Sequence, residues 1–161
     1  MPAQAWIDKL DLAPHPEGGW YREIYRSTDE VEHSRFDGPR SACTSIYYLL
    51  QADEFSALHR IKSDEGWHHY AGDALEVVVI HPSGERADLR LGPGGTPHAV
   101  VPHGAWFGSR VAAGGGWALV GCTVSPGFDF QDFEMAERER LIRAFPQHTE
   151  VIHALTRTEH S

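Results

Sequence analysis

The residues best suited to chemistry lie in the stretch HRIKSDEGWHHYAG, which spans positions 59–72. It offers an imidazole at His59, a carboxyl group at Glu65 and a second imidazole at His69. Successive side chains of a strand point to opposite faces, so His59 and Ile61 share one face, and Glu65, Trp67 and His69 share one face of the next strand. If the two strands form a hairpin, these side chains all line the same interior.

One interpretation of this cluster is a metal centre. Such a site needs at least three protein ligands with nitrogen or oxygen donors and leaves further positions open. His59 and Glu65 supply two ligands, His69 could supply a third, and His98 or His103 could reach inward from a loop. A divalent metal is therefore one cofactor that the sequence allows.

A second interpretation needs no metal. His59, oriented by Glu65, would act as a general base, and Tyr21 or Tyr47 on the facing wall would return the proton as the acid. This arrangement suits proton abstraction next to a carbonyl group, as in an epimerase or isomerase, with Trp67 as a wall against which a ring could stack. In a third interpretation, His59 and Glu65 are a buried hydrogen-bonded pair that only holds the hairpin together.

Two further segments bear on the same site. Residues 15–21, HPEGGWY, place a double glycine before a strand, which lets the backbone pass close to a neighbour. We expect Glu17 or Tyr21 from this segment to close the mouth of a pocket. The expected contacts to a bound molecule are Trp67, His69, Glu17 and Phe107. The aromatic residues of 126–134 are instead spaced as core residues commonly are.

Strands must position most of these residues. Period-2 alternation with aromatic or β-branched residues predicts strands at 20–27, 42–50, 55–61, 66–70, 75–80, 86–91, 99–101, 105–111 and 117–124. Helices are expected at 3–10, 133–145 and 149–156. Short strands separated by turn signals are typical of a sandwich or barrel.

Length and composition limit the class of protein. A chain of 161 residues, 41% of them hydrophobic, predicts one domain over 1–161, with a β core at about 15–127 and a helical segment at about 132–157. A net charge of -9 argues against nucleic-acid partners and anionic membranes. No signal-like segment or membrane-spanning apolar run is present, so a cytoplasmic protein with free thiols at Cys43 and Cys122 is expected.

Together these segments resemble the cupin superfamily and, within it, the uncharacterised Cupin_5-like group with an RmlC-like jelly roll. The resemblance runs from about Leu10 to Phe145. It rests on HPEGGWY (15–21), SIYYLL (45–50), HRIKSDEGWH (59–68), AGD (71–73), VPHGAWF (101–107) and VGCTVSPGFDF (120–130). It implies an all-β cupin double-stranded β-helix, a jelly-roll barrel with short flanking N- and C-terminal helices, assembled as a homodimer.

The resemblance also bears on the metal. Metal-dependent cupins use two histidines, a glutamate and a later histidine, and of these only His59 and Glu65 carry over, since Ile61 and Phe107 occupy the other positions. The leading hypothesis is a protein that binds, and isomerises or epimerises, a small polar metabolite such as a sugar derivative in the barrel pocket. The alternatives are a non-catalytic small-molecule-binding module and a metal-dependent cupin enzyme such as a dioxygenase.

Overall fold

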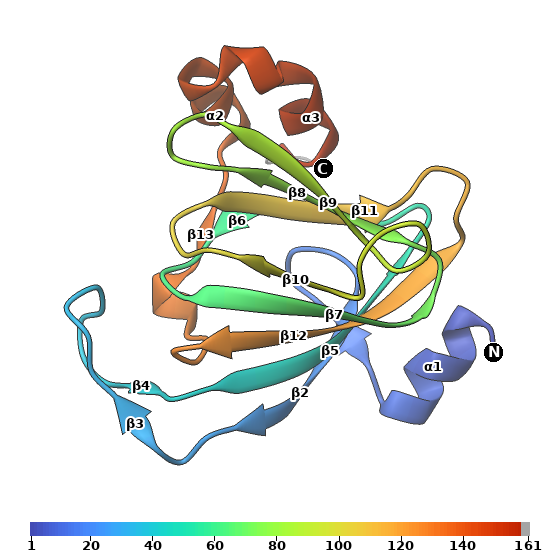
Figure 1. Ribbon diagram of the computed structural model, residues 1–161, viewed down its shortest axis with the longest axis horizontal. Coiled ribbons are helices and arrows are strands. Elements are labelled where there is room, and N and C mark those ends of the chain that lie inside the picture. The colour runs from blue at the N-terminus through green and yellow to red at the C-terminus, as the bar shows by residue number, and fades with distance from the viewer. Residues whose placement is uncertain (159–161) are drawn as a thin grey trace.

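Two antiparallel β-sheets face each other in the computed structural model, which describes residues 1–158 (Figure 1). In order across the first sheet lie β1 (Ala13–Pro14), β2 (Trp20–Arg26), β5 (Thr44–Gln51), β12 (Trp117–Ser125), β7 (Asp64–Gly72) and β10 (His98–Val101). In order across the second lie β13 (Glu134–Met135), β6 (Phe55–Arg60), β11 (Trp106–Val111), β8 (Leu75–Ile80) and β9 (Arg86–Leu91). A separate pair joins β3 (Glu30–Val31) to β4 (Arg40–Ser41).

This arrangement confirms the mostly β jelly roll that the sequence predicts, but not a closed barrel. Within the described residues, no strand of the first sheet is hydrogen-bonded to a strand of the second. The strands at three of the four sheet edges, β1, β13 and β10, have only two, two and four residues. Edges this short offer few backbone groups for pairing across the gap, so side-chain packing joins the two layers instead.

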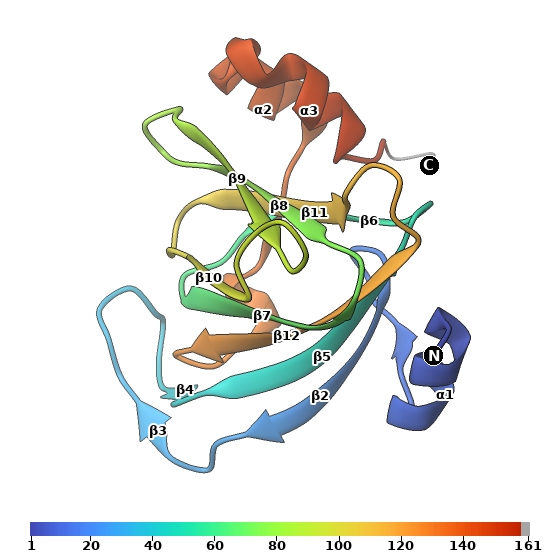
Figure 2. The ribbon, with the colours of Figure 1, turned by 45° about the vertical axis from the view of Figure 1, so that its right-hand side comes forward.

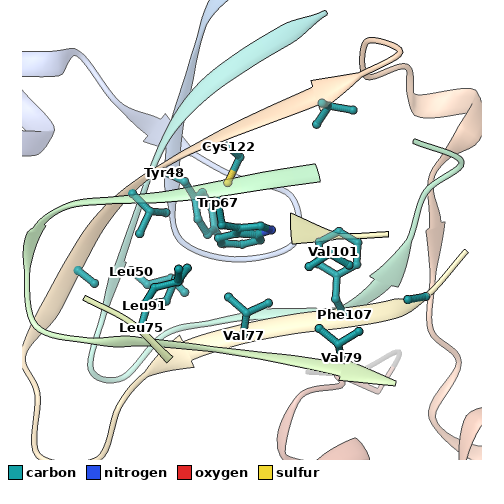
Figure 3. Packing of buried hydrophobic residues seen from close by; sticks show 14 of the residues in the cluster. Tyr48, Leu50, Trp67, Leu75, Val77, Val79, Leu91, Val101, Phe107 and Cys122 are labelled. Atoms are coloured by element: carbon teal, nitrogen blue, oxygen red, sulfur yellow. The ribbon is translucent and has the colours of Figure 1, made fainter. Parts of the chain in front are cut away.

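The main core lies between the sheets, where inward-facing residues of both layers meet (Figure 3). Its largest side chains are Trp67, Tyr48 and Phe107, each of which is almost fully buried. The indole of Trp67 meets Tyr48 and Phe107 edge-on, with interplanar angles of 85° and 90°. Burying such large rings is the main source of stability in a two-layer β fold.

Helices cover parts of the outer faces. Helix α1 (Ala3–Leu10) packs through Ile7 on the outer side of the first sheet, against Leu49 and Leu119. At the other end of the chain, α2 (Arg138–Ala144), the 3-10 turn η2 (Pro146–His148) and α3 (Thr149–Ala154) cover the outer side of the second sheet (Figure 2). No helix of the described part of the chain is long and apolar enough to cross a membrane.

The helix that the sequence predicts at 133–145 begins later than expected. After the 3-10 turn η1 (Phe130–Asp132), Glu134 and Met135 form β13 and pair with Arg60 and His59 of β6. The backbone groups of this segment thus extend a sheet, and α2 starts only at Arg138. The pairing has a consequence for chemistry, because it places the chain after η1 directly beside His59.

Candidate functional site

A cavity of about 480 Å³ opens between the sheets at the end where His59 and Glu65 lie. Its lining includes the imidazoles of His15 and His59, the buried carboxyl groups of Glu17 and Glu65, and the thiol of Cys122. Its aromatic lining comprises Tyr21, Tyr48, Trp67, Phe128 and Phe130. The cavity therefore combines a small set of buried acids and imidazoles with apolar walls, which is typical of small-molecule sites.

Three elements bring the central groups together. His59 comes from β6 of the second sheet, Glu65 from β7 of the first, and Glu17 from the loop between β1 and β2. That loop passes so close to β6 that a Cβ atom at Gly18 would lie 2.0 Å from the carbonyl oxygen of Phe55, and the φ angle of Gly18 is 113°. Only glycine tolerates both conditions, which accounts for the HPEGG segment.

The ring of His59 is held on several sides. Its Nδ1 atom lies 2.7 Å from the carbonyl oxygen of Ala57 and 3.2 Å from Oε2 of Glu17. A carbonyl oxygen only accepts, so Nδ1 carries the proton of the neutral ring and Nε2 carries the lone pair. Phe133 stacks on the ring at 5.2 Å between centroids, and Phe107 packs against it at 4.2 Å.

The carboxyl group at Nδ1 of His59 is thus Glu17 and not Glu65, which corrects the predicted pairing. No hydrogen bond joins His59 to Glu65 among the residues that the structure describes, although the two groups interact electrostatically. Glu65 lies beside the buried thiol of Cys122, whose pKa is raised by burial and then by the charge of Glu65. Glu65 therefore contributes its carboxyl group to the cavity wall beside Cys122 and does not orient the imidazole.

Burial dominates the protonation of this site. It raises the pKa of Glu17 to about 8 and the pKa of Glu65 to about 8, and the charge of Glu17 raises the pKa of Glu65 further. Burial also lowers the pKa of His59 and lowers the pKa of His15 to about 4. Near neutral pH the buried end of the cavity therefore presents neutral carboxylic acids at Glu17 and Glu65, which can donate protons, beside neutral imidazoles at His15 and His59, which can accept them.

Tyrosine and tryptophan shape the walls. The hydroxyl of Tyr48 donates to the carbonyl oxygen of Gly18, so it helps to hold the glycine loop. Tyr21 packs edge-on against His15 at 4.4 Å between ring centroids, and its hydroxyl has no hydrogen-bond partner among residues 1–158. The N–H of Trp67 is buried and likewise has no such partner in that range. In Figure 3 this nitrogen lies at the end of the indole nearer to Phe107.

Sequence comparison now identifies the family. The family model described as Cupin superfamily (DUF985) matches residues 4–136. The chain belongs to this Cupin_5 family. A hypothetical protein from Leishmania major is 39% identical, with a TM-score of 0.93, and the match covers 98% of this chain and 100% of that one. A crystallised protein from Shewanella oneidensis is 41% identical, with a TM-score of 0.89 and 99% coverage of both chains.

More distant structures share the fold alone. A cupin 2 domain-containing protein from Halorhodospira halophila is 15% identical, with a TM-score of 0.58 and coverage of 91% of this chain and 88% of that one. Oxalate decarboxylase from Bacillus subtilis is 16% identical, with a TM-score of 0.57 and coverage of 91% and 37%. A comparison with curated proteins gives no match. The comparisons establish a cupin-family protein but no substrate or reaction.

In this Cupin_5 chain the residues do not fit the metal site that the superfamily suggests. No three His, Cys, Asp or Glu side chains of the described residues converge so as to hold a metal ion. Ile61 and Phe107 fill the core at two of the expected ligand positions. His98 stacks on His68 on the opposite face of the sheet, and His103 lies 3.1 Å from Asp64. The predicted set of His59, Glu65 and His69 is therefore not assembled.

Three predicted site residues do not line the cavity. Tyr47 faces the outer side of the first sheet, where it packs near Leu49 and Tyr70, because Ile46 and Tyr48 hold the inward positions of β5. His69 lies about 13 Å along β7 from Glu65, and its Nε2 bonds the carbonyl oxygen of Asp73 at 2.8 Å. Phe107 supports His59 from behind and does not line the cavity.

Glu17, Tyr21 and Trp67 do line the cavity, together with residues that the sequence interpretation missed. The missed residues include His15, Tyr48, Cys122, Phe128 and Phe130. A strict period-2 assignment of SIYYLL would have found Tyr48, since Leu50 and Ile46 share its face. The aromatic residues of 126–134, which the sequence interpretation assigned to the core, lie in two environments. Phe130 is 58% exposed at the rim of the cavity, whereas Phe133 stacks on His59.

Proposed function

We propose that the cavity binds a small polar metabolite that contains a carbonyl group, such as a sugar derivative, and isomerises or epimerises it by proton transfer. A volume of about 480 Å³ suits a ligand of that size. The aromatic walls offer Trp67 as a face for a ring, and Arg26, Glu23 and Asp129 supply polar groups in the lining. The lining thus matches a compact molecule with one ring and several oxygen atoms.

His59 acts as the base in this proposal. Since Nδ1 donates to Ala57, the lone pair on Nε2 removes a proton from the carbon next to the substrate carbonyl. Glu65, protonated near neutral pH, donates to the carbonyl oxygen as negative charge develops there. The products of this step are an imidazolium ion at His59, a carboxylate at Glu65 and a neutral enol of the substrate.

Tyr21 returns the proton. It projects from β2 of the first sheet, whereas His59 projects from β6 of the second, so the two groups approach a bound substrate from opposite walls. Proton donation from the Tyr21 hydroxyl to the opposite face of the enol carbon gives the epimer, and the enol proton returns to Glu65. Exchange with water through the cavity mouth then removes the proton from His59 and restores the one on Tyr21.

A single observation supports this proposal most strongly. His59, Glu17 and Glu65 are each less than a tenth exposed, yet all three line one cavity, with both carboxyl pKa values raised to about 8. Burying three ionisable groups in a core costs stability, so a functional role would account for their presence there. Their protonation states near neutral pH are those that acid–base chemistry needs.

Solvent deuterium exchange tests the proposal and does not require the product to be identified. The protein is incubated in D₂O with aldoses, ketoses and 2-oxo acids, and proton NMR follows loss of signal at the carbon next to each carbonyl. His59→Gln is expected to slow exchange by roughly 10² to 10⁴-fold, and Glu65→Gln is expected to slow it less because it keeps the shape of a neutral acid. Glu150→Gln on α3 is the matched control.

The same experiment separates catalysis from binding. A compound that shifts cavity resonances with no deuterium incorporation would support the non-catalytic binding module instead. Exchange that is unchanged in His59→Gln would refute the assigned base. Exchange that is abolished by a chelator and restored by one divalent metal would instead support a metal-dependent enzyme.

A further inference from the structure

We propose that Arg157 is a positioning residue that fixes the Glu17 loop in the cavity and so makes the C-terminal segment part of the site. This inference rests on the proposed function for its catalytic meaning, but its structural basis is independent. Arg157 follows α3 and lies beyond residues 4–136, which the family model matches. Its side chain nevertheless reaches the backbone of the loop that carries Glu17.

Hydrogen bonds from other segments of the chain hold the Glu17 loop in place. Glu17 lies outside any strand, and its carboxyl group must hold a 3.2 Å contact with Nδ1 of His59. Within residues 1–158, the carbonyl oxygen of Glu17 accepts two hydrogen bonds, from the N–H of Ala57 at 3.0 Å and from Arg157 at 2.9 Å. One of the two bonds thus comes from the site's own strand, β6, and the other from the far end of the chain.

A single guanidinium group joins the loop to β6. One of its terminal nitrogens donates to the carbonyl oxygen of Glu17 and the other donates to the carbonyl oxygen of Phe55 at 3.1 Å. Its central carbon lies 3.9 Å from the centroid of the Phe55 ring, a cation–π distance. A Cβ atom at Gly18 would lie 2.7 Å from the same group. The glycine therefore makes room for Arg157 as well as for the strand.

The two residues before Arg157, Leu155 and Thr156, are themselves fixed to β6 and α2. The carbonyl oxygen of Leu155 accepts from the N–H of Leu58 on β6 at 2.8 Å, and the Leu155 side chain is fully buried. Arg138 at the start of α2 donates to the carbonyl oxygen of Thr156 at 2.6 Å and to its hydroxyl at 2.7 Å. The C-terminal helical segment thus places the guanidinium group of Arg157 beside the Glu17 loop.

The contact between Arg157 and the Glu17 loop has an electrostatic effect as well as a structural one. The positive charge of Arg157 opposes the effect of burial on the pKa of Glu17. Loss of the charge would leave Glu17 protonated over a wider pH range, and loss of the two-armed contact would let its carboxyl group leave Nδ1 of His59. A residue that only stabilised the fold would alter neither property.

Nuclear magnetic resonance on the free protein tests the proposal. Side-chain ¹³C signals follow the titration of Glu17, assigned by comparison with Glu17→Gln, and ¹⁵N signals follow Nδ1 of His59. In Arg157→Gln we expect the pKa of Glu17 to rise by roughly half a unit or more and the Nδ1 resonance to shift. Arg140→Gln removes an exposed cation from α2 and should change neither signal.

Arg157→Lys keeps the positive charge and removes the two-nitrogen contact of the guanidinium group. This variant tests the proposal if Arg157→Gln does not fold. Its Glu17 titration should stay closer to that of the unmodified protein, while the His59 signal should still shift. Unchanged Glu17 and His59 signals in a folded Arg157→Gln protein, or in Arg157→Lys, would overturn the positioning role. The Glu17 and His59 signals are both measured in the free protein. The positioning role of Arg157 can therefore be established or refuted even if the isomerase proposal fails.

Discussion

Replacing Glu65 by Gln should remove much of the pH dependence of stability that the cavity imposes. The pKa of Glu65 is raised from 4.5 to about 8 on folding. Between these values the folded state holds a proton that the unfolded state has released, so the free energy of unfolding falls as the pH rises. Linkage gives a loss of about 2 kcal/mol per such carboxyl group between about pH 6.5 and about pH 8.5.

Glu17 contributes a similar loss over the same window, because its pKa is also raised to about 8. His15, whose pKa is lowered to about 4, acts in the opposite direction, but only below its unfolded value of 6.5. The window above pH 6.5 therefore reports mainly on the two carboxyl groups. The unmodified protein should lose about 4 kcal/mol across it and Glu65→Gln about 2 kcal/mol.

Urea denaturation followed by tryptophan fluorescence at several pH values measures these slopes. Glu17→Gln should flatten the slope at least as much as Glu65→Gln, since the Glu17 charge also raises the pKa of Glu65. Glu150→Gln, on the exposed side of α3, is the control and should retain the full slope. A Glu65→Gln protein with the same slope as the unmodified protein would refute the assigned protonation.

Backbone crowding, the missing ligand set and the exposed sheet face each give a further prediction. Gly18→Ala should cost more than about 3 kcal/mol of stability, because the new Cβ would meet the Phe55 carbonyl. Gly104→Ala, with a φ of 83° and open space around it, should cost roughly 1 kcal/mol. Equal unfolding midpoints for the two variants would contradict this prediction. Elemental analysis of untagged protein should find less than about a tenth of an equivalent of transition metal, since no three-ligand set converges among the described residues; one equivalent that is lost in Glu65→Ala would contradict it. We propose a homodimer, given the exposed Tyr70 and Val100 on the outer side of the first sheet; light scattering should show two chains, and a Tyr70→Asp protein of the same mass would argue against that face.

The strands and the central residues of the site were predictable because period-2 alternation is a local property. It places Glu65 and Trp67 on one face of β7 and His59 on the facing wall, as the structure confirms. The same rule was misapplied to β5, where Tyr48 and not Tyr47 faces the cavity. For His69 the face alone was insufficient, because position along the strand decides which end of the interior a side chain reaches.

The partners of His59 could not be predicted from local pattern. The approach of Glu17 depends on a loop fixed by β6 and by Arg157, and no local spacing encodes contacts between such distant segments. The helical interpretation of 133–145 failed for a related reason, since Glu134 and Met135 satisfy their backbone groups on β6. The protonation of the carboxyl groups depends on burial, which exists only in the folded chain.

The link between Arg157 and Glu17 also sets when the site can form during synthesis. These residues are 140 positions apart in the chain. At ribosomal rates of about 5 to 20 residues per second, Arg157 is added roughly 7 to 30 s after Glu17. During that interval the loop lacks its hydrogen bond from Arg157, and only its contacts with residues such as Tyr48 and Ala57 can hold it. The cavity therefore reaches its final form only after Arg157 has left the ribosome and joined the Glu17 loop, so the site matures after most of its lining residues have been synthesised.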